Sequence, residues 1–513
     1  MLERDLSNYE GHWVALFDEL VVGVGETPKA ALALAKRNRP KDRFTIRYVE
    51  RAGGTPLELP PLLVKLRPFF LKQSQPIYLV GGAVRDILLG KPVHDLDFVV
   101  PQGAIRLSMK TGDAFGWPAY VLDKERDTGR VVIAEQDTTL DFAKFRGSNL
   151  EEDLKDRDFT LNALALPATA KYRESVVDLV GGLAALDARQ IQLTNPNALT
   201  NDPVRAIRAV RQAHSLSLHI DETTKQAIRS AVPLLDQPSS ERIRDEWLKV
   251  LSIQSPAPAV TRIHTLGFLT QIFPELDQRM IERSGKLDML RELVQIERFI
   301  DGHQATEGSL AVTALSPFRD ELKAHLSQTF DGGVNGRILL RLMALFFQPE
   351  SANSPQGTAE SVEARLRKMA FSNQAIAYLK KGLIQQGRFN KLVQQLGEQP
   401  ILPRQIYRYF LEFENEGVDQ LILVSASKAL GYFQKHEEAT DKIINALLEG
   451  RFKRYNQVIN PPMLINGREL MQQLKLPSGP EIGRLLRLIK EEQAAGKITT
   501  LEDALNFARL ASN

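Results

Sequence analysis

Residues 79–100, with the sequence LVGGAVRDILLGKPVHDLDFVV, decide the fold predicted for this chain. Asp95 and Asp97 are two residues apart and lead into the apolar run 98–100, a pattern typical of a β-strand. Alternate residues of a strand point to the same face, so the two carboxylates should point together. Paired carboxylates repel each other unless a cation or a proton lies between them. Oxygen ligands of this kind favour Mg²⁺, which usually binds substrate phosphates as well.

A glycine pair precedes the two aspartates. Gly81 and Gly82 follow the apolar run 77–80, and glycine lets the backbone approach a ligand closely. The segment therefore predicts a strand, a glycine turn that receives phosphate, a short helix and a strand that carries a metal. A glycine pair or an Asp-x-Asp pattern alone is common in turns and helix caps. The order of both, with Arg85 and Asp86 between them, is more specific.

Composition limits the class of protein. The chain has 513 residues, which suggests three or four domains at about 150 residues each. It has 66 basic and 63 acidic residues, so any nucleic-acid surface must be a local patch. The absence of cysteine excludes disulfides and thiolate metal sites and permits a reducing compartment. We expect a cytoplasmic protein with no signal peptide and no membrane span, because no run of about 18 apolar residues occurs.

Patterning along the chain predicts five segments. They are a small α+β module at 1–55, an α/β head at 60–170, a helical neck at 171–275, a helical body at 276–450 and a helical tail at 451–513. The module should be a separate unit with strands at 12–17, 20–25 and 43–49, a helix at 28–38, and Trp13 in its core. The polar stretch 348–360 predicts an exposed loop.

The segment quoted above resembles the head motif of the class II tRNA nucleotidyltransferases and bacterial poly(A) polymerases, within the polymerase-β-like nucleotidyltransferases. The resemblance covers residues 73–275 well and the tail moderately. It implies an α/β nucleotidyltransferase head followed by an all-α neck, body and tail. It also implies that Asp95 and Asp97 hold the metals for nucleotidyl transfer.

A third carboxylate follows in the alternating run TTLDFAKF, at Asp141. With the run 131–135 it predicts a hairpin that turns near residues 136–137. A third acid on a neighbouring strand would complete a two-metal site, and the resembling family has an acid at a position like this one. The alternative is an acid on a solvent-facing strand edge.

The segment EEDLKDRDFTLNALAL predicts a helix in which Asp158 and Asn162 are neighbours one turn apart. Arg157 offers a planar fork for phosphate, and Asp and Asn can accept hydrogen bonds from ribose hydroxyls. The alternative is a helix start at which Asp158 is favoured by the helix dipole. The resemblance implies that this motif contacts nucleotide phosphate and sugar, and that Gly82, Arg85 and Arg157 hold the triphosphate.

The segment TNDPVRAIRAVRQ predicts a helix with Pro203 at its first position and Asp202 as its N-cap. Arg205 and Arg208 lie on adjacent turns. The resemblance implies that the Asp and Arg of this motif form hydrogen bonds with the incoming base, so that the protein itself selects C or A. The alternative is a cap with solvated arginines. Asn201 stands where the family often has an acid, and we expect an adjusted base choice there.

Near the end of the chain, Pro480 precedes a predicted helix that carries Arg484, Arg487 and Lys490 three residues apart. Such a face can contact RNA phosphates, or it can simply be solvated. The surrounding sequence resembles the tail of tRNA-maturing members of the family.

The function that this pattern implies is template-independent addition of C and/or A to the 3′ end of tRNA, complete or partial. The substrates would be ATP and CTP with Mg²⁺, and neither DNA nor a membrane is an expected partner. One alternative is poly(A) addition to RNA ends, because both activities share these motifs. Another is a catalytically silent RNA-binding or nucleotide-binding protein.

Overall fold

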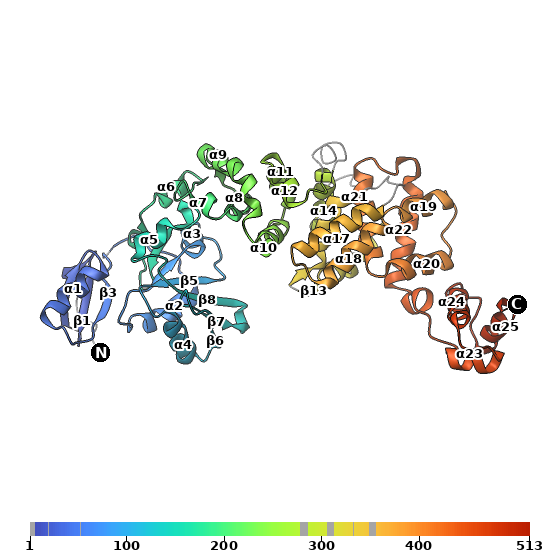
Figure 1. The fold of residues 1–513 in the computed structure, drawn as a ribbon, viewed down its shortest axis with the longest axis horizontal. Helices are drawn as coiled ribbons and strands as arrows, with labels where there is room; N and C mark the ends of the chain where they lie inside the picture. Colours follow the sequence, from blue (N-terminus) through green and yellow to red (C-terminus); the bar gives the residue numbers. More distant parts are fainter. Residues whose placement is uncertain are drawn as a thin grey trace. The chain divides into compact units, whose positions relative to one another are not determined.

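The computed structural model divides the chain into two compact units, Met1–Leu234 and Leu235–Asn513 (Figure 1). The boundary falls inside the predicted neck. The structure describes residues 6–18, 20–51, 53–276, 286–304, 312–331, 333–347 and 355–512.

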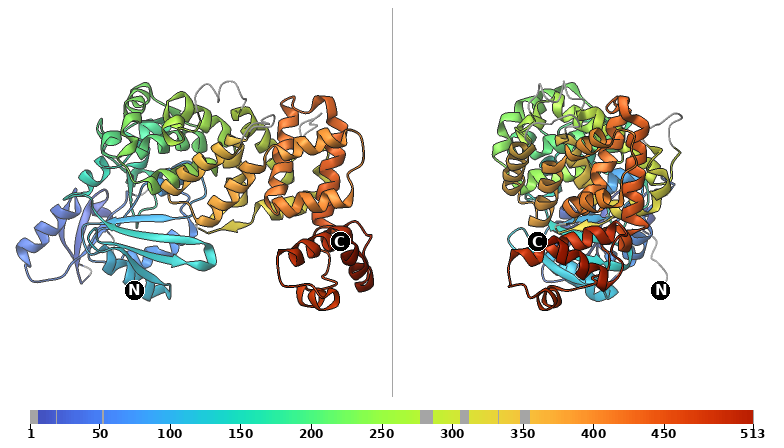
Figure 2. Two further views of the ribbon diagram at one scale, coloured as in Figure 1. Left: turned by 45° about the vertical axis from the view of Figure 1, so that its right-hand side comes forward. Right: turned by 90° about the vertical axis from the view of Figure 1, so that its right-hand side faces the viewer.

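A seven-stranded mixed sheet forms the centre of the first unit, and the left view of Figure 2 shows its strands side by side. Its order is β10-β9-β4-β5-β8-β7-β6. The strands are β4 (Tyr78–Val80), β5 (Leu96–Val100), β6 (Ala119–Asp123), β7 (Thr128–Ile133), β8 (Thr138–Lys144), β9 (Leu164–Pro167) and β10 (Val177–Asp178). Only the β5–β8 pair is parallel within this sheet, whose residues are all described. The predicted α/β head and its β7–β8 hairpin are confirmed.

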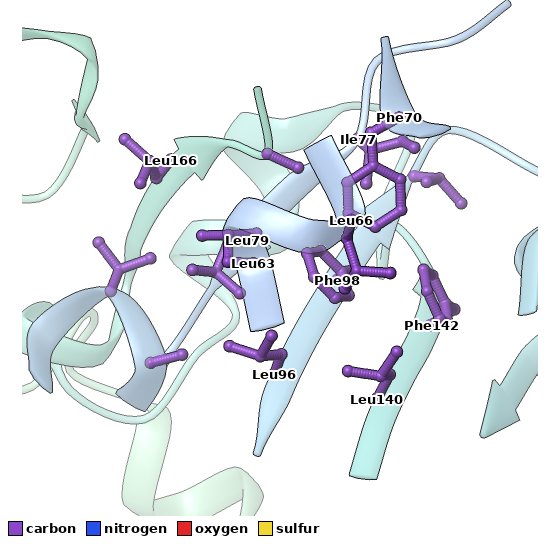
Figure 3. Packing of buried hydrophobic residues seen from close by; sticks show 14 of the residues in the cluster. Leu63, Leu66, Phe70, Ile77, Leu79, Leu96, Phe98, Leu140, Phe142 and Leu166 are labelled. Carbon is purple, nitrogen blue, oxygen red and sulfur yellow. The ribbon is translucent and has the colours of Figure 1, made fainter. Parts of the chain in front are cut away.

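Because side chains alternate along each strand, the sheet has two faces, and different parts of the chain pack against each of them. Leu96 and Phe98 point into a core that also contains residues of α2 (Pro61–Phe70) (Figure 3). Val100 and residues of α4 (Ala104–Phe115) belong to the same core. Phe98 stacks on Phe142 of the neighbouring strand, with ring centroids 5.1 Å apart. Because the side-chain period of a strand is two, Asp97 and the residues in step with it belong to the opposite face.

The N-terminal module has the predicted elements. Its three strands, β1 (Trp13–Phe17), β2 (Leu20–Gly25) and β3 (Thr45–Tyr48), pair in the order β2-β1-β3, and α1 spans Pro28–Asn38. Helix α1 approaches β2 closely at Gly23. A Cβ atom at this position would lie only 2.2 Å from the Ala31 carbonyl oxygen. The glycine therefore permits this helix–strand contact.

The module is not a separate unit, contrary to the sequence-based expectation. Trp13 is 7% exposed, and its ring centroid lies 5.6 Å from that of Tyr78 on the central sheet. Both belong to one apolar cluster that also includes Val99 and residues of α1 and β3. Glu50 reinforces this contact by accepting a hydrogen bond from the Tyr172 backbone N–H at 3.1 Å. The second face of the sheet is apolar there, so it needs this cover.

The predicted helix after Asp158 is wrong. The structure has a single 3₁₀ turn (Thr160–Asn162) followed by β9. Phe159 is extended, with φ −126° and ψ 148°. Residues 164–166 are fully buried between β4 and β10, so the apolar run serves both faces of a sheet rather than one face of a helix.

Short helices complete the first unit. They are α3 (Gly82–Leu88), α5 (Leu150–Lys155), α6 (Gly182–Asp187), α7 (Ala198–Asn201), α8 (Val204–Leu216) and α9 (Glu222–Ala231). Two short strands pair in parallel: β11 (Gln190–Ile191), which follows α6, and β12 (His219–Ile220), which follows α8.

The second unit is helical in nearly all of its described residues, as predicted for the body and tail. Its helices are α10 (Ser240–Leu251), α11 (Pro256–Thr265), α12 (Phe268–Ile272), α14 (Lys286–Ile300), α15 (Arg319–Leu326), α16 (Gly336–Phe346), α17 (Pro355–Lys368), α18 (Asn373–Gln385), α19 (Arg388–Leu396), α20 (Pro403–Phe413), α21 (Glu416–Ala429), α22 (Glu437–Phe452), α23 (Gly467–Leu474), α24 (Pro480–Ala494) and α25 (Leu501–Ala511). The last three lie close together (Figure 1). They share an apolar cluster of their own.

Two further expectations concern this unit. Of the predicted loop 348–360, residues 348–354 lie outside the described residues, and the remainder begins α17. In the parts of the chain that the structure describes, no helix is both long and apolar enough to cross a membrane.

The shared core predicts that Trp13→Ala destabilises the first unit. Deleting a buried tryptophan ring costs about 3–5 kcal/mol, so the midpoint of urea unfolding, followed by circular dichroism, should fall clearly. Leu34→Ala on α1 is the matched control, because Leu34 is 44% exposed and its loss should stay within about 0.5 kcal/mol. Equal midpoints for the two variants would contradict the shared core.

Candidate active site

Two carboxylates lie directly opposite each other on the open face of the central sheet. The parallel register of β5 and β8 pairs Asp97 with Asp141. Asp95 lies just before β5, and its Oδ1 accepts hydrogen bonds from the N–H and the Oγ1 of Thr139, both at 2.9 Å. Asp97 and Asp141 are therefore paired across two strands, and the Asp95 side chain is bound to Thr139, which lies two residues before Asp141.

The Asp97 carboxyl is poised to gain a cation or a proton. Its side chain has open surface, yet protein atoms surround it on most sides. Burial and then repulsion from Asp141 raise the pKa of Asp97 to about 6, whereas the Arg157 charge opposes this shift. A bound cation would relieve the same repulsion.

Asp141 already has a cationic partner in Arg130, which sequence analysis missed. The antiparallel register of β7 and β8 places Arg130 opposite Asp141. Its Nε and Nη2 each donate to one carboxylate oxygen of Asp141 at 2.6 Å. These hydrogen bonds raise the pKa of Arg130 above its usual range, although its partial burial acts in the other direction. Only the register of the β7–β8 hairpin would have identified the Arg130–Asp141 pair, and the sequence does not specify that register.

The donor set fits a hard divalent cation at Asp97 and Asp95. Both are oxygen ligands, and the raised pKa of Asp97 marks a place where added positive charge is favourable. Within the described ranges, no three His, Asp or Glu side chains converge closely enough to hold a metal by themselves. A metal that also binds Asp141 would have to replace part of the Arg130 pair.

The glycine turn opens onto the same space as these carboxylates. Gly81 has φ +75° and ψ −143°, a backbone conformation that side chains rarely adopt. A Cβ atom there would lie 3.2 Å from Arg157 Nη1 and 3.8 Å from Asp97 Oδ2. Arg157 Nε and Nη2 donate to Oδ2 of the buried Asp153 at 3.1 and 2.8 Å. Asp153, another missed residue, thereby directs Nη1 of Arg157 toward the turn.

Arg85 lies beneath this turn and is largely occupied by protein partners. Its Nε and Nη2 donate to the two Asp86 oxygens at 2.8 Å, and its Nη1 donates to Asn162 Oδ1 at 2.6 Å. The residue is 8% exposed. Its Nη2 would lie 3.2 Å from a Cβ at Gly82, the next residue of the turn. Arg85 therefore positions Asn162 and supports the turn from within.

Asp158 and Asn162 are neighbours, as predicted, although no α-helix joins them. Asn162 Nδ2 donates to Asp158 Oδ1 and to Gln212 Oε1, each at 3.0 Å. Arg208 Nη1 donates to Asp158 Oδ2 at 3.2 Å. Burial acts to raise the pKa of Asp158, but the Arg208 charge and these hydrogen bonds outweigh it and hold that pKa below its usual range. Gln212 was missed, although it lies one turn beyond Arg208 on α8.

The predicted base-reading helix begins one residue later than expected. Helix α8 starts at Val204, so Pro203 occupies the N-cap position and Asp202 lies one residue before it. The Asp202 carbonyl oxygen accepts from the Arg205 backbone N–H at 3.1 Å. Asp202 Oδ2 lies 3.5 Å from Arg205 Nε, so the two side chains that the resemblance assigns to the base are adjacent.

Backbone carbonyls orient the Arg205 guanidinium. Its Nη2 donates to the Asp156 carbonyl oxygen at 3.1 Å, and its Nη1 lies 3.5 Å from those of Arg157 and Ala198. Asn201 is exposed at the end of α7. The arginine is thus held by backbone carbonyls and lies beside Asp202.

The three basic residues of α24 have separate partners within the second unit. Arg484 pairs with Glu481 and donates to the Ala511 carbonyl oxygen at 2.6 Å. Arg487 donates to a carbonyl of its own helix at 3.3 Å. Lys490 donates to Asn460 Oδ1 at 3.3 Å. Arg484 therefore supports the packing of α25, whereas the contacts of the other two are longer.

The raised pKa of Asp97 has a testable consequence for stability. The pKa of Asp97 is about 6 in the folded protein, compared with its usual 3.8. The contribution of this group to the stability of the fold is therefore largest below pH 3.8 and is lost as the pH rises through about 6. In the absence of divalent cations, Asp97→Asn should therefore raise the melting temperature most above pH 6. The gain should shrink on acidification and vanish near pH 4.

Thermal unfolding of both proteins at pH 7.5, 5.5 and 4.5 in a chelating buffer measures this effect. Asp113→Asn is the control, because Asp113 is an exposed aspartate of α4 and its replacement should change little at any pH. A lower melting temperature for Asp97→Asn at pH 7.5 would contradict the raised pKa of Asp97.

Three family models match the chain in sequence order. One described as the poly A polymerase head domain covers residues 77–192, and one described as an RNA- and SrmB-binding site of polymerase A covers 217–280. A model of tRNA nucleotidyltransferase domain 2 covers 355–508. The first contains Asp95, Asp97, Asp141 and both glycines of the turn, whereas Asp202 lies between the first and second models.

Whole-chain comparisons agree with these models. An A-adding tRNA nucleotidyltransferase of Deinococcus radiodurans is 30% identical over 454 residues, covering 84% of this chain and 94% of the relative. A CC-adding tRNA nucleotidyltransferase of Geobacter sulfurreducens is 28% identical, covering 84% and 90%. The fold is similar to that of a CCA-adding enzyme solved with CTP, with a TM-score of 0.62, 20% identity and coverage of 88% and 95%. This chain belongs to the tRNA nucleotidyltransferase family of enzymes.

Proposed function

We propose that this chain transfers nucleotides from CTP and ATP to the 3′ end of tRNA and so builds all or part of the CCA terminus. The observation that carries the proposal is the pairing of Asp97 with Asp141 beside a glycine turn that faces Arg157. Membership of the family supports the RNA substrate, because the relatives are named for adding C, A or CCA to tRNA. The cytoplasm, where these substrates occur, is its proposed location.

We propose that Asp95, Asp97 and Asp141 hold the divalent cations, and that these are Mg²⁺. Nucleotidyltransferases of this family generally use divalent metals, and carboxylates next to a phosphate site suit Mg²⁺. When bound, such ions lower the pKa of an attacking hydroxyl and stabilise the leaving oxygen of pyrophosphate. Arg130 would neutralise Asp141 whenever it lacks a metal.

The phosphates of the nucleotide would lie along the turn. Gly81 and Gly82 leave room for close approach, and Arg157 Nη1 is held over that space through Asp153. Arg85 would contribute from below, mainly by positioning Asn162. An arginine fixed by a buried carboxylate loses little freedom when it binds an anion.

The sugar and the base would meet the next layer of side chains. Asp158 and Asn162, held by Arg208, can hydrogen-bond to ribose hydroxyls. Asp202 and Arg205 can read the base edge through one acceptor and one donor. Since Arg205 also donates to the carbonyl oxygen of Asp156, next to Arg157, its placement links base reading to the phosphate site.

RNA contact by Arg487 and Lys490 of the tail, and more weakly by Arg484, is part of the same proposal. Backbone phosphates are the expected partners, because these side chains offer charge rather than a shaped site.

Poly(A) addition is the second candidate, favoured by one observation. The head model that matches residues 77–192 is the poly A polymerase head domain. This activity differs from the first in its product, because it would give long A tails on many RNAs. A catalytically silent RNA-binding protein would incorporate no nucleotide at all.

A primer-extension assay tests the proposal. The purified protein is incubated with Mg²⁺ and tRNA lacking its 3′ end, with CTP alone, ATP alone or both, and the products are sized. We expect one to three nucleotides and then a stop. Asp97→Ala should reduce incorporation at least about 10³-fold, since metal-ion catalysis supplies several kcal/mol, while tRNA binding persists. Long A tails would support poly(A) addition instead, and an active Asp97→Ala would refute the metal assignment.

The base-reading pair predicts a selective defect. Asp202→Ala should lower discrimination between the correct nucleotide and the wrong ones by roughly tenfold or more, because a lost hydrogen bond to the base weakens selection. Incorporation rates with each nucleotide at saturation provide the measurement. Asp187→Ala, at an aspartate with a 72% exposed side chain, is the control. A uniform loss of rate without a change in selectivity would remove Asp202 from base reading.

A further inference from the structure

A short basic segment connects α1 to β3 in the N-terminal module. Residues 36–43, KRNRPKDR, contain five basic residues and one acidic residue. The whole chain carries a net charge of only +3. A basic run of this length is typical of surfaces that bind nucleic acid, and it lies outside the family models, the first of which begins at residue 77.

The side chains of this segment are available to a partner. Lys36, Arg37, Lys41 and Arg43 are all exposed. No ion pair or hydrogen bond engages these four side chains within the described part of the chain, whereas Arg39 pairs with Asp42 at 3.4 Å. Like charges packed this closely repel each other, and a polyanion would relieve that repulsion.

The helix dipole explains only part of the pattern. Lys36 and Arg37 lie in the last turn of α1, where cations are favoured by the carbonyl end of a helix. That effect falls off within one turn. It therefore does not explain Lys41 and Arg43, which lie beyond the helix.

The segment is fixed to the sheet face that carries the candidate active site. It leads directly into Phe44 and Ile46, which are buried in one cluster with Tyr78 and Val99 of the central sheet. Val99 points to the same face as Asp97, because the two are separated by one residue of β5. The module thus covers the continuation of the face on which the carboxylates lie.

We propose that residues 36–43 bind the phosphate backbone of the RNA substrate while its 3′ end occupies the site at Asp97. This inference rests on the proposed function for the identity of the RNA. The surface offers charge and length but no shaped pocket among its described residues, so recognition is of the backbone and not of bases. Binding is consequently salt-dependent, through the release of counterions.

The test compares three forms of the full chain. In the neutral variant, Lys36→Gln, Arg37→Gln and Lys41→Gln are combined. In the matched control, Lys36→Arg, Arg37→Lys and Lys41→Arg keep every charge. The Kd for tRNA lacking its 3′ end is measured between 50 and 200 mM KCl, together with the KM of the incorporated nucleotide at saturating tRNA.

We expect the neutral variant to bind tRNA about tenfold more weakly at the lowest salt. The slope of log Kd against log salt should fall by about three, one for each lost phosphate contact. The KM for the nucleotide should not change, and the charge-retaining control should behave as the parent. Circular dichroism confirms that both variants are folded.

An unchanged Kd and salt slope in the neutral variant would overturn the inference, and would leave an acidic protein as the partner for this surface. An equal loss in both variants would also overturn it, since charge would then not be the cause. The Kd is measured without turnover, so it tests RNA binding independently of activity. If the protein incorporates no nucleotide but the neutral variant shows the expected change in salt slope, the proposed function is refuted and this inference is not.

Discussion

The parallel pairing of β5 with β8 is the constraint on which the rest of this structure depends. It brings two carboxylates opposite each other on a rigid sheet, where neither can move away. Burial, together with the resulting repulsion, raises the pKa of Asp97 to about 6, so that added positive charge is favourable there. Arg130 on β7 and Arg157 near the glycine turn supply that charge from the protein itself. The sheet thus makes carboxylates costly and cations favourable at the place where we propose a metal site.

Sequence patterns predicted the elements whose structure is determined by residues adjacent in the chain. Alternation at Asp97 identified β5, and the glycine pair identified the turn before α3. The helix expected after Asp158 was wrong, because a run buried on both faces of a sheet lacks the alternation that would identify a strand. Whether such a run is helix or strand is decided by its neighbours β4 and β10, of which β4 lies far away in the sequence.

Most of the residues that orient the site could not be predicted for a related reason. Arg130 and Gln212 act through partners brought near by hairpin register or by helix packing, whereas Asp153 pairs with Arg157 only four residues along the chain, a spacing that could have revealed it. Arg205 is held chiefly by backbone carbonyls, and a carbonyl has no residue identity that a sequence pattern could reveal. The resemblance implies which side chains should contact the nucleotide, whereas the structure adds the residues that hold these side chains in place.

The N-terminal module follows from the same strand geometry. The alternation that points Asp97 toward the open site also points Val99 away from the main core, and an apolar side chain there must be covered. Trp13 and Phe44 provide that cover. Since one face of one strand serves both purposes, the module cannot shift without disturbing the sheet that carries the carboxylates. Its basic segment therefore keeps a constant place relative to the site, as a backbone-binding surface must if it is to deliver an RNA end to a fixed point.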